Sequence, residues 1–295
     1  MNANDSEGRR YCGRVFSADE IEQIRRLIFS EPKRNRAQLS REVCDILDWR
    51  RPDGRRKDMS CRVAMLRMER DGLISLPPPL WGNGNGRNRP CITSASDPQE
   101  PIVLPAGQLG VLTFRIVDRG SGSSLWNELI DRYHYLGYKP LPGAQLRYFV
   151  FSGSRLLAAL GFGASAWKVA PRDRFIGWAP GERTQSLHLI VNNARFLILP
   201  WVMSRNLASR ILAGVAKRLP GDWKNRYGYE PVLLETFVDR SRFRGTCYRA
   251  ANWIHVGETQ GRGKLDRHHR HSLPVKAVFL YPLSRHFRKR LCTLM

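Results

Sequence analysis

The stretch that most constrains the fold of this chain runs from Pro231 to Gly263. It begins with Pro231–Val238, an apolar run rich in Val, Leu, Thr and Phe, which is the composition of a buried strand. A polar turn follows, a short helix begins at Gly245, and a second strand covers Trp253–Val256. The spacing predicts a strand, helix and strand unit of about 30 residues, which is long enough for a crossover connection. The same pattern also fits a well-packed core without a site.

Apolar segments before and after this stretch predict a mixed α/β domain over residues 111–295. One helix is expected after Ser123 and a longer one after Asn206, while Ser165–Arg183 is expected to be a loop dense in Trp, Arg and Lys. The remaining strands are expected at Val111–Val117, Leu146–Phe151, Leu156–Phe162, Leu187–Val191, Phe196–Leu199 and Val275–Leu283.

The first 78 residues predict a separate, mostly helical domain. Ser17 and Glu20 form a capping box ahead of helical apolar spacing, and two more helices are expected at Ala37–Asp48 and Asp58–Asp71. Gly72 ends the third helix, and a short strand-like segment follows it. Three helices and a strand-like wing predict a winged helix. Residues 79–110, which are rich in Pro, Gly and Asn, are expected to be a flexible linker.

The charge of the chain favours a polyanionic partner. Lys and Arg number 49 against 26 Asp and Glu, so the formal net charge is +23. Release of counterions drives such chains onto phosphate backbones. Residues 1–80 carry 17 basic and 13 acidic residues, whereas residues 109–295 carry 30 and 11, so the excess lies chiefly on the second domain and tail.

Other residue patterns exclude several classes of protein. Six cysteines are scattered without a CxxC pair, which indicates free thiols in a reducing cytoplasm and no zinc ribbon. No signal peptide and no membrane-spanning run is recognisable. The GNGNG run of the linker lacks the Lys-Ser/Thr of a phosphate loop. The sequence therefore predicts no bound cofactor and no membrane association.

Exposed basic residues are the candidates for nucleic-acid binding. In a winged helix the third helix would enter the major groove, while the loop before it would meet phosphates. The alternative is a small helical module that binds protein. The candidate residues are Arg55, Arg56, Lys57, Arg62, Arg67, Lys168, Arg172, Arg174, Arg249, Arg262 and Lys264.

Candidate catalytic residues are few. Glu235 and Asp239 share one face of a regular strand and could hold a cation. An ordinary ion pair with Arg240, Arg242 or Arg249 is the competing interpretation. His134, between two tyrosines, could act as a general base, stack on a base or pack at a helix end. Cys247 near a helix start could have a lowered pKa.

Five blocks together resemble a bacterial family that includes protein A of the Druantia anti-phage system. They occur in the order of that family and cover most of residues 112–283. The last block also resembles the end of a GNAT-type N-acetyltransferase core. The blocks are RYHYLGY (132–138), SAWKVAPRDRFIGW (165–178), VNNARFLILPWV (191–202), DWKNRYGYEPVLLETFVD (222–239) and GTCYRAANW followed by VG, T and GRG (245–263).

The resemblance implies an α/β (α+β) architecture, with the N-terminal winged helix followed by a GNAT-like mixed-sheet domain. It implies a nucleic-acid-binding component of an anti-phage system that acts on duplex or forked DNA with a helicase and other defence subunits. A GNAT-type acyltransferase, with Tyr248 as general acid, is the first alternative. The turn Leu199–Asn206 lacks the glycines that cradle acyl-CoA pyrophosphate, which argues against this alternative. A transposon-associated DNA-binding protein is the second alternative.

Overall fold

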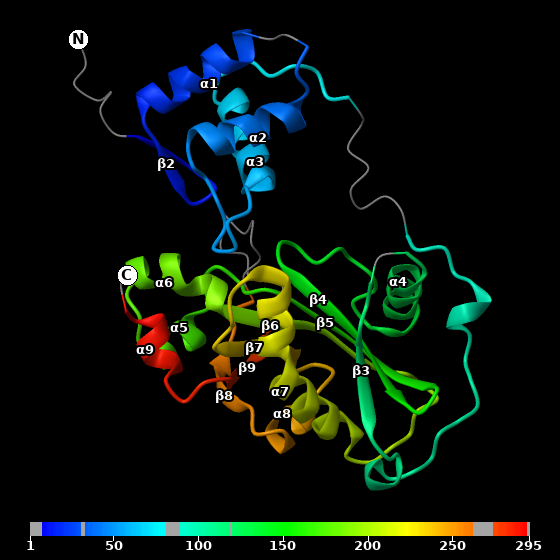
Figure 1. Ribbon diagram of the computed structural model, residues 1–295. Coiled ribbons are helices and arrows are strands. Elements are labelled where there is room, and N and C mark those ends of the chain that lie inside the picture. Colours follow the sequence, from blue (N-terminus) through cyan, green and yellow to red (C-terminus); the bar gives the residue numbers. More distant parts are fainter. Residues whose placement is uncertain (1–7, 31–32, 81–88, 119, 262–273, 294–295) are drawn as a thin grey trace. The chain divides into compact units, whose positions relative to one another are not determined.

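The computed structural model describes residues 8–30, 33–80, 89–118, 120–261 and 274–293 (Figure 1). The chain divides into two compact units, Met1–Asn85 and Gly86–Met295. Each has its own hydrophobic core. No helix among the described residues is both long and apolar enough to cross a membrane.

Unit 1 consists of a hairpin and three helices. Strands β1 (Arg9–Tyr11) and β2 (Arg14–Phe16) are antiparallel and precede α1 (Ala18–Ser30), α2 (Arg36–Ile46) and α3 (Asp58–Arg70). The apolar faces of the helices meet in one core with Phe16, Leu39, Met65 and Met68 at its centre.

The predicted capping box is present at the start of α1. The Ser17 hydroxyl accepts a hydrogen bond from the Glu20 backbone N–H, and the Glu20 carboxylate accepts one from Ser17 N–H, both at 3.1 Å. The predicted wing is not seen, because Leu73–Pro77 lies outside any strand and the hairpin precedes the first helix. The structure therefore does not confirm a winged helix.

Unit 2 is built on a seven-stranded sheet of order β3-β4-β5-β6-β7-β9-β8. Neighbouring strands are antiparallel except β6 and β7, which are parallel. This confirms the predicted mixed α/β class. The strands are β3 (Leu112–Ile116), β4 (Gln145–Ser152), β5 (Arg155–Ala164), β6 (Ile190–Ile198), β7 (Leu233–Asp239), β8 (Ile254–Glu258) and β9 (Lys276–Pro282).

The order of the strands departs from one expectation. The predicted unit around residues 231–263 forms as β7, the short helix α8 (Thr246–Ala250) and β8. However, β9 lies between β7 and β8 and is antiparallel to both. The two strands are therefore parallel without being neighbours, because the last strand of the chain inserts between them.

Helices cover both faces of the sheet, and consecutive residues of β4 show which helix lies where. Arg147 donates to Asn127 and Ser123 of α4 (Ser121–Tyr133), whereas Tyr148 donates to Asp222 of α7 (Leu207–Tyr227). Side chains alternate along a strand, so α4 and α7 lie on opposite faces.

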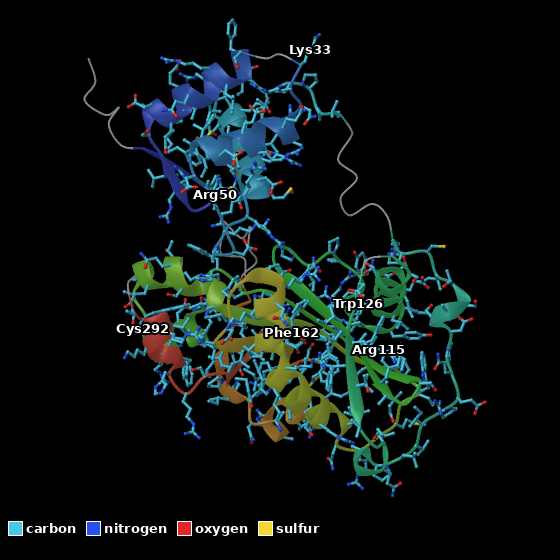
Figure 2. The ribbon with its side chains drawn as sticks, viewed as in Figure 1. Lys33, Arg50, Arg115, Trp126, Phe162 and Cys292 are labelled. Carbon is cyan, nitrogen blue, oxygen red and sulfur yellow. The ribbon has the colours of Figure 1, made fainter. Side chains whose placement is uncertain are left out.

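Two large side chains illustrate how the sheet and its helices pack. Trp126 on α4 and Phe162 on β5, both labelled in Figure 2, are among the largest fully buried side chains. A Cβ at Gly161 would lie 2.9 Å from the Trp126 ring, so only glycine lets the indole approach this strand. Trp126 Nε1 donates to Leu160 O at 3.1 Å.

Several segments differ from their predicted form. The expected loop Ser165–Arg183 contains α5 (Ala170–Ile176) and the start of α6 (Pro180–Ser186). One strand, β6, runs through Asn192 and Asn193, which pair with Gly163 and Phe162 of β5, and the bulge against β5 follows them at Ala194. The remaining elements are α9 (Phe287–Leu291) and the short 3-10 helices η1 (Ser94–Ser96), η2 (Ala106–Gln108) and η3 (Leu187–Leu189).

Part of the expected linker packs on unit 2. The Thr93 backbone N–H and hydroxyl donate to the buried Glu128 carboxylate at 2.9 and 2.8 Å. Ile102 pairs in parallel with Val202. Residues 93–109 are thus ordered by contacts with the second unit, because Ile102, Ala106 and Leu109 belong to its core.

Candidate functional site

Strands β6 and β7 diverge, and a cavity lies where they separate. Their ladder joins only Ile190–Asn192 to Leu233–Glu235, although both strands continue beyond these residues. The cavity of about 460 Å³ lies beyond the last paired residues. We call it the β6–β7 cleft. It is lined by Tyr133, His134, Tyr135, Leu136, Asn193, Ala194, Phe196, Leu197, Ile198, Ala208, Thr236, Phe237, Val238, Phe243, Arg244, Gly245, Thr246, Cys247 and Tyr248.

A hydrogen-bonded trio joins the two diverging strands to α8. The Tyr248 hydroxyl donates to Asn193 Oδ1 at 2.9 Å, and the Thr236 hydroxyl donates to the Asn193 backbone carbonyl at 3.0 Å. Asn193 is almost fully buried, so these bonds satisfy polar groups that have left the ladder. Burial raises the pKa of Tyr248 well above its ordinary value. Its phenol is therefore a neutral hydrogen-bond donor at pH 7.

His134 lies at the end of α4 and contributes a neutral imidazole to the cleft. Its Nδ1 accepts the Leu136 N–H at 3.3 Å, which places the ring proton on Nε2. Burial, with a smaller contribution from the positive charge of Arg195, lowers the pKa of His134 to about 4. The predicted candidates His134 and Tyr248 thus line one cavity.

Glu235 does not belong to the cleft. It is fully buried and binds Arg172 Nη1 through Oε2 at 2.8 Å, and its Oε1 accepts the Ala166 N–H at 2.8 Å. On β7, Thr236 faces α8, so Glu235 faces α5 on the other side of the sheet. Glu235 does form an ion pair, but with Arg172 and not with the expected Arg240, Arg242 or Arg249. Its burial in this pair contradicts the hypothesis that Glu235 is catalytic.

The same contact corrects the prediction for Arg172. Its side chain has no exposed surface, and it binds Glu235, Asp173 and the Ala166 carbonyl. It therefore cannot reach a nucleic acid. Asp239 accepts hydrogen bonds from Ser241 and does not join a metal site. Among the described residues no cluster of three or more potential metal ligands occurs.

The structure also corrects the prediction for Cys247. Burial raises the pKa of its thiol, and this outweighs the opposing backbone hydrogen bonds. The expected low pKa is therefore wrong. None of the six cysteines forms a disulfide, in keeping with the prediction of free thiols.

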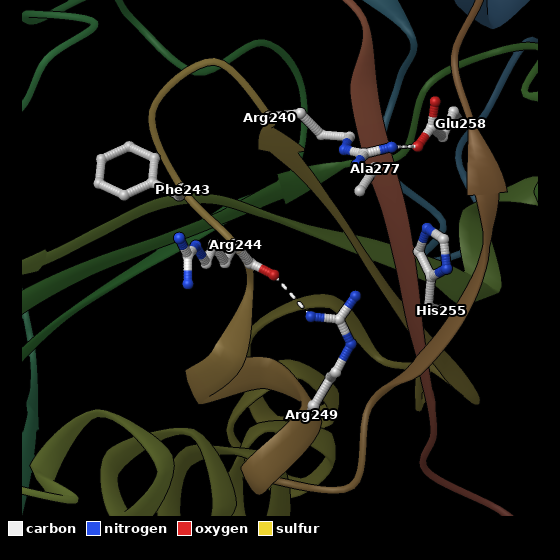
Figure 3. Close-up of a pocket in the computed structure, with 7 residues that line it drawn as sticks. All are labelled: Arg240, Phe243, Arg244, Arg249, His255, Glu258 and Ala277. Atoms are coloured by element: carbon white, nitrogen blue, oxygen red, sulfur yellow. Dashed lines mark hydrogen bonds and ion pairs between the residues drawn. The ribbon is translucent and has the colours of Figure 1, made fainter.

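A second cavity, the basic pocket, adjoins the β7–α8 loop (Figure 3). It has a volume of about 470 Å³ and is lined by Arg240, Phe243, Arg244, Arg249, His255, Glu258 and Ala277. Arg240 is ion-paired with Glu258, and Arg249 donates to the Arg244 carbonyl at 2.6 Å. The predicted Arg249 thus lies in a concave surface that carries more positive than negative charge.

Unit 1 carries a third cavity, the arginine hollow, which has a volume of about 410 Å³. It is lined by Arg41, Arg50, Arg51, Arg55, Arg56 and Asp58. Asp45 binds Arg56 at 2.7 Å and Arg50, labelled in Figure 2, at 3.2 Å. These ion pairs hold two guanidinium groups in place at the border of the hollow.

The other predicted basic residues are dispersed. Lys57 is half-buried, and burial lowers its pKa, while Arg62 lies 3.9 Å from Asp58 on α3. Arg67, Lys168 and Arg174 are exposed. Two further candidates, Arg262 and Lys264, lie outside the described residues.

Several residues of these cavities were not singled out from the sequence. Asn193 stands in an apolar run, and a buried polar residue there is itself a signal of a hydrogen-bonded role. The three arginines at alternate positions of Arg240–Arg244, with Phe243 between the last two, are a second such signal. Thr236 and Tyr135 carry no comparable local pattern, because only the fold brings them to the cleft.

The sequence of residues 69–272 matches the family described as Druantia protein DruA. The chain belongs to this family. It is therefore a component of a Druantia-type defence system, as the five sequence blocks indicated. No curated protein matches the chain.

Several of the solved structures that are similar to the chain are described as acetyltransferases. One from Staphylococcus aureus Mu50 is 14% identical, covers 59% of this chain and 100% of its own, and gives a TM-score of 0.36. The polyamine N-acetyltransferase of Drosophila melanogaster is 14% identical over 58% of this chain and 100% of its own, with a TM-score of 0.37. The Escherichia coli ribosomal-protein-S18-alanine N-acetyltransferase is 10% identical over 59% and 95%, with a TM-score of 0.35.

The strand-to-helix turn before α7 of this DruA-family chain is poorly suited to acetyl-CoA. Residue Pro200 has no N–H, and the Val202 and Met203 N–H groups donate to Leu199 O and Ile102 O, both at 2.8 Å. Trp201 is buried against Tyr133, with ring centroids 5.4 Å apart. At these three positions the backbone donor is thus absent or already used, so the turn offers fewer donors to a pyrophosphate than a glycine-rich turn does.

Proposed function

We propose that this chain is the nucleic-acid-binding subunit of a Druantia system, which docks on DNA and works with a helicase subunit. The observation that supports this most is the arginine hollow of unit 1. Five guanidinium groups around one concavity form an arrangement suited to phosphate oxygens, because each guanidinium offers a planar fork of donors. The net charge of +23 adds long-range attraction to the same partner.

The ion pairs of the hollow decide which residues should be tested. Arg50 and Arg56 are both ion-paired with Asp45, so removing either arginine would also take a partner from the Asp45 carboxylate. Arg55 lies 3.9 Å from Asp53, and its side chain is 66% exposed. Arg51 and Arg55 are therefore the residues whose loss changes the binding charge with little effect on the unit.

The test is fluorescence anisotropy of the full chain with duplex, forked and single-stranded DNA at several salt concentrations. The double variant Arg51→Ala/Arg55→Ala should weaken duplex binding and reduce the salt slope by about two, since each lost phosphate contact removes close to one. The matched control is Arg10→Ala/Arg26→Ala, which removes the same charge from other exposed positions of unit 1. An equal loss in both variants, or no loss in either, would refute the role of the hollow.

The acyltransferase alternative has one supporting observation, which is Tyr248 in the wall of a cleft. Two further features of the chain weigh against it. The phenol already donates to Asn193, and the turn before α7 has few free donors for a pyrophosphate. We therefore do not propose acyl transfer.

A further inference from the structure

We propose that the β6–β7 cleft and the basic pocket together bind one unpaired nucleotide of a DNA strand. The base would enter the cleft, and its phosphate would lie in the basic pocket. This inference rests on the proposed nucleic-acid-binding function and adds a second site, on unit 2, with its own ligand. The site would serve a strand that is already open, such as one arm of a fork.

The two cavities share a wall. Phe243 and Arg244 line both of them and belong to the loop Arg240–Arg244 between β7 and α8. Figure 3 shows Arg249 and His255 on one side of this loop, while the side chains of Phe243 and Arg244 point to the other side. A nucleotide that crosses the loop would meet an aromatic ring and guanidinium groups at once, which is the pairing its base and phosphate require.

The rim of the cleft is an aromatic surface that lies partly in solvent. Half of the Phe243 surface is exposed, and its ring meets Tyr135 edge to face at 5.3 Å. Tyr135 in turn stacks on His134 at 4.9 Å and lies under the Arg242 guanidinium at 5.4 Å. Exposed rings beside arginines are how proteins stack unpaired bases, because every base has a π face.

Inside the cleft, polar groups are available for the edge of a base. The His134 Nε2–H is a donor, since Nδ1 already accepts the Leu136 N–H. Arg195 does not itself line the cleft, but its positive charge acts on His134, and its buried Nε has no hydrogen-bond partner among the described residues. The volume of about 460 Å³ falls within the range of small-molecule sites, roughly 300–1,000 Å³. A base and its sugar can therefore be enclosed.

The basic pocket offers the phosphate site. Arg249 uses one guanidinium nitrogen on the Arg244 carbonyl, and the rest of the group borders the pocket (Figure 3). Among the described residues that line the pocket, Glu258 is the one carboxylate, and Arg240 neutralises it. Arg249 therefore remains as an uncompensated charge for a phosphate diester in the pocket, and Arg244 offers a second one on the other side of the loop.

The test compares affinities of the full chain for single-stranded and fully duplex DNA. Phe243→Ala should weaken single-strand binding on the order of tenfold through the lost stacking, with duplex affinity unchanged within twofold. Phe243→Leu keeps an apolar side chain and should give the same loss. Phe29→Ala removes an 88% exposed ring from α1 and is the matched control, with no expected change. A strand carrying 5-iododeoxyuridine should cross-link on irradiation to the peptide containing Phe243.

Each other outcome overturns the inference. Equal weakening of single-strand and duplex binding by Phe243→Ala would make the ring a general DNA contact. Unchanged single-strand binding would exclude it from the site. Competition by free deoxyadenosine monophosphate or coenzyme A, with no cross-link to the strand, would assign the cavities to a free nucleotide. Failure of the role proposed for the arginine hollow is a separate result, because only the duplex affinity would then be independent of Arg51 and Arg55.

Discussion

Replacing either partner of the Arg172–Glu235 pair should lower the denaturant concentration at which unit 2 unfolds. Both side chains are completely buried, and their N–O distance is 2.8 Å. Arg172 also binds the Ala166 carbonyl at 2.7 Å and lies over the Trp178 ring at 5.5 Å. The pair thereby ties the segment that contains α5 to the centre of the sheet.

The size of the stability loss depends on which buried group each substitution leaves without its partner. Loss of one partner of a buried ion pair costs about 3–5 kcal/mol, because the other charge stays desolvated. In Glu235→Gln, Arg172 keeps Asp173 at 2.7 Å, so we expect about 3 kcal/mol. In Arg172→Ala, Glu235 keeps only the Ala166 N–H and the packing on Trp178 is lost, so we expect about 5 kcal/mol.

The pH dependence gives a second readout of Arg172→Ala. Burial holds the pKa of Glu235 above its ordinary value, and removal of the guanidinium raises it further. The folded state of the variant then binds a proton more tightly than the unfolded state does. Its loss of stability relative to the parent chain should therefore be larger at pH 7 than at pH 5.

The assay is urea denaturation followed by tryptophan fluorescence and by circular dichroism. The double variant Arg172→Met/Glu235→Leu serves as control and should lose less than Arg172→Ala, because no buried charge remains. Losses below about 1 kcal/mol in both single variants would refute the reasoning.

Three other predictions concern single residues. His134 has a pKa of about 4 in the folded chain, so below pH 6.5 the unfolded chain takes up a proton there while the folded chain does not. The folded state therefore loses stability as the pH falls from 6.5 to 4. His134→Gln should remove about 3 kcal/mol of this loss, measured as the difference in unfolding free energy between pH 7 and 4. Gly245 has φ +70°, and a Cβ there would lie 2.7 Å from the Phe279 ring, so Gly245→Ala should cost about 2–4 kcal/mol and lower the thermal midpoint. Cys91 is exposed whereas burial raises the pKa of Cys61, so Cys91 should react with a maleimide well before Cys61 in mass-spectrometric time courses.

Local patterns in the sequence determined most of the elements. The Ser17–Glu20 box, the apolar spacing of the first helices and the β-branched run before Asp239 each act within a few residues, so they predict helices and strands without knowledge of the partner. The mixed α/β class followed from the order of these elements. The five sequence blocks identified the family, which the match over residues 69–272 confirms.

Only the tertiary structure decided which residues meet. Glu235 and Thr236 are neighbours in sequence, yet they face opposite sides of the sheet, and this separates the buried ion pair from the cleft. Insertion of β9 between β7 and β8 is a long-range pairing, which no local pattern specifies. The cleft itself exists because β6 and β7 share only three ladder pairs before they diverge, so Asn193, Thr236 and Tyr248 must satisfy one another across the gap.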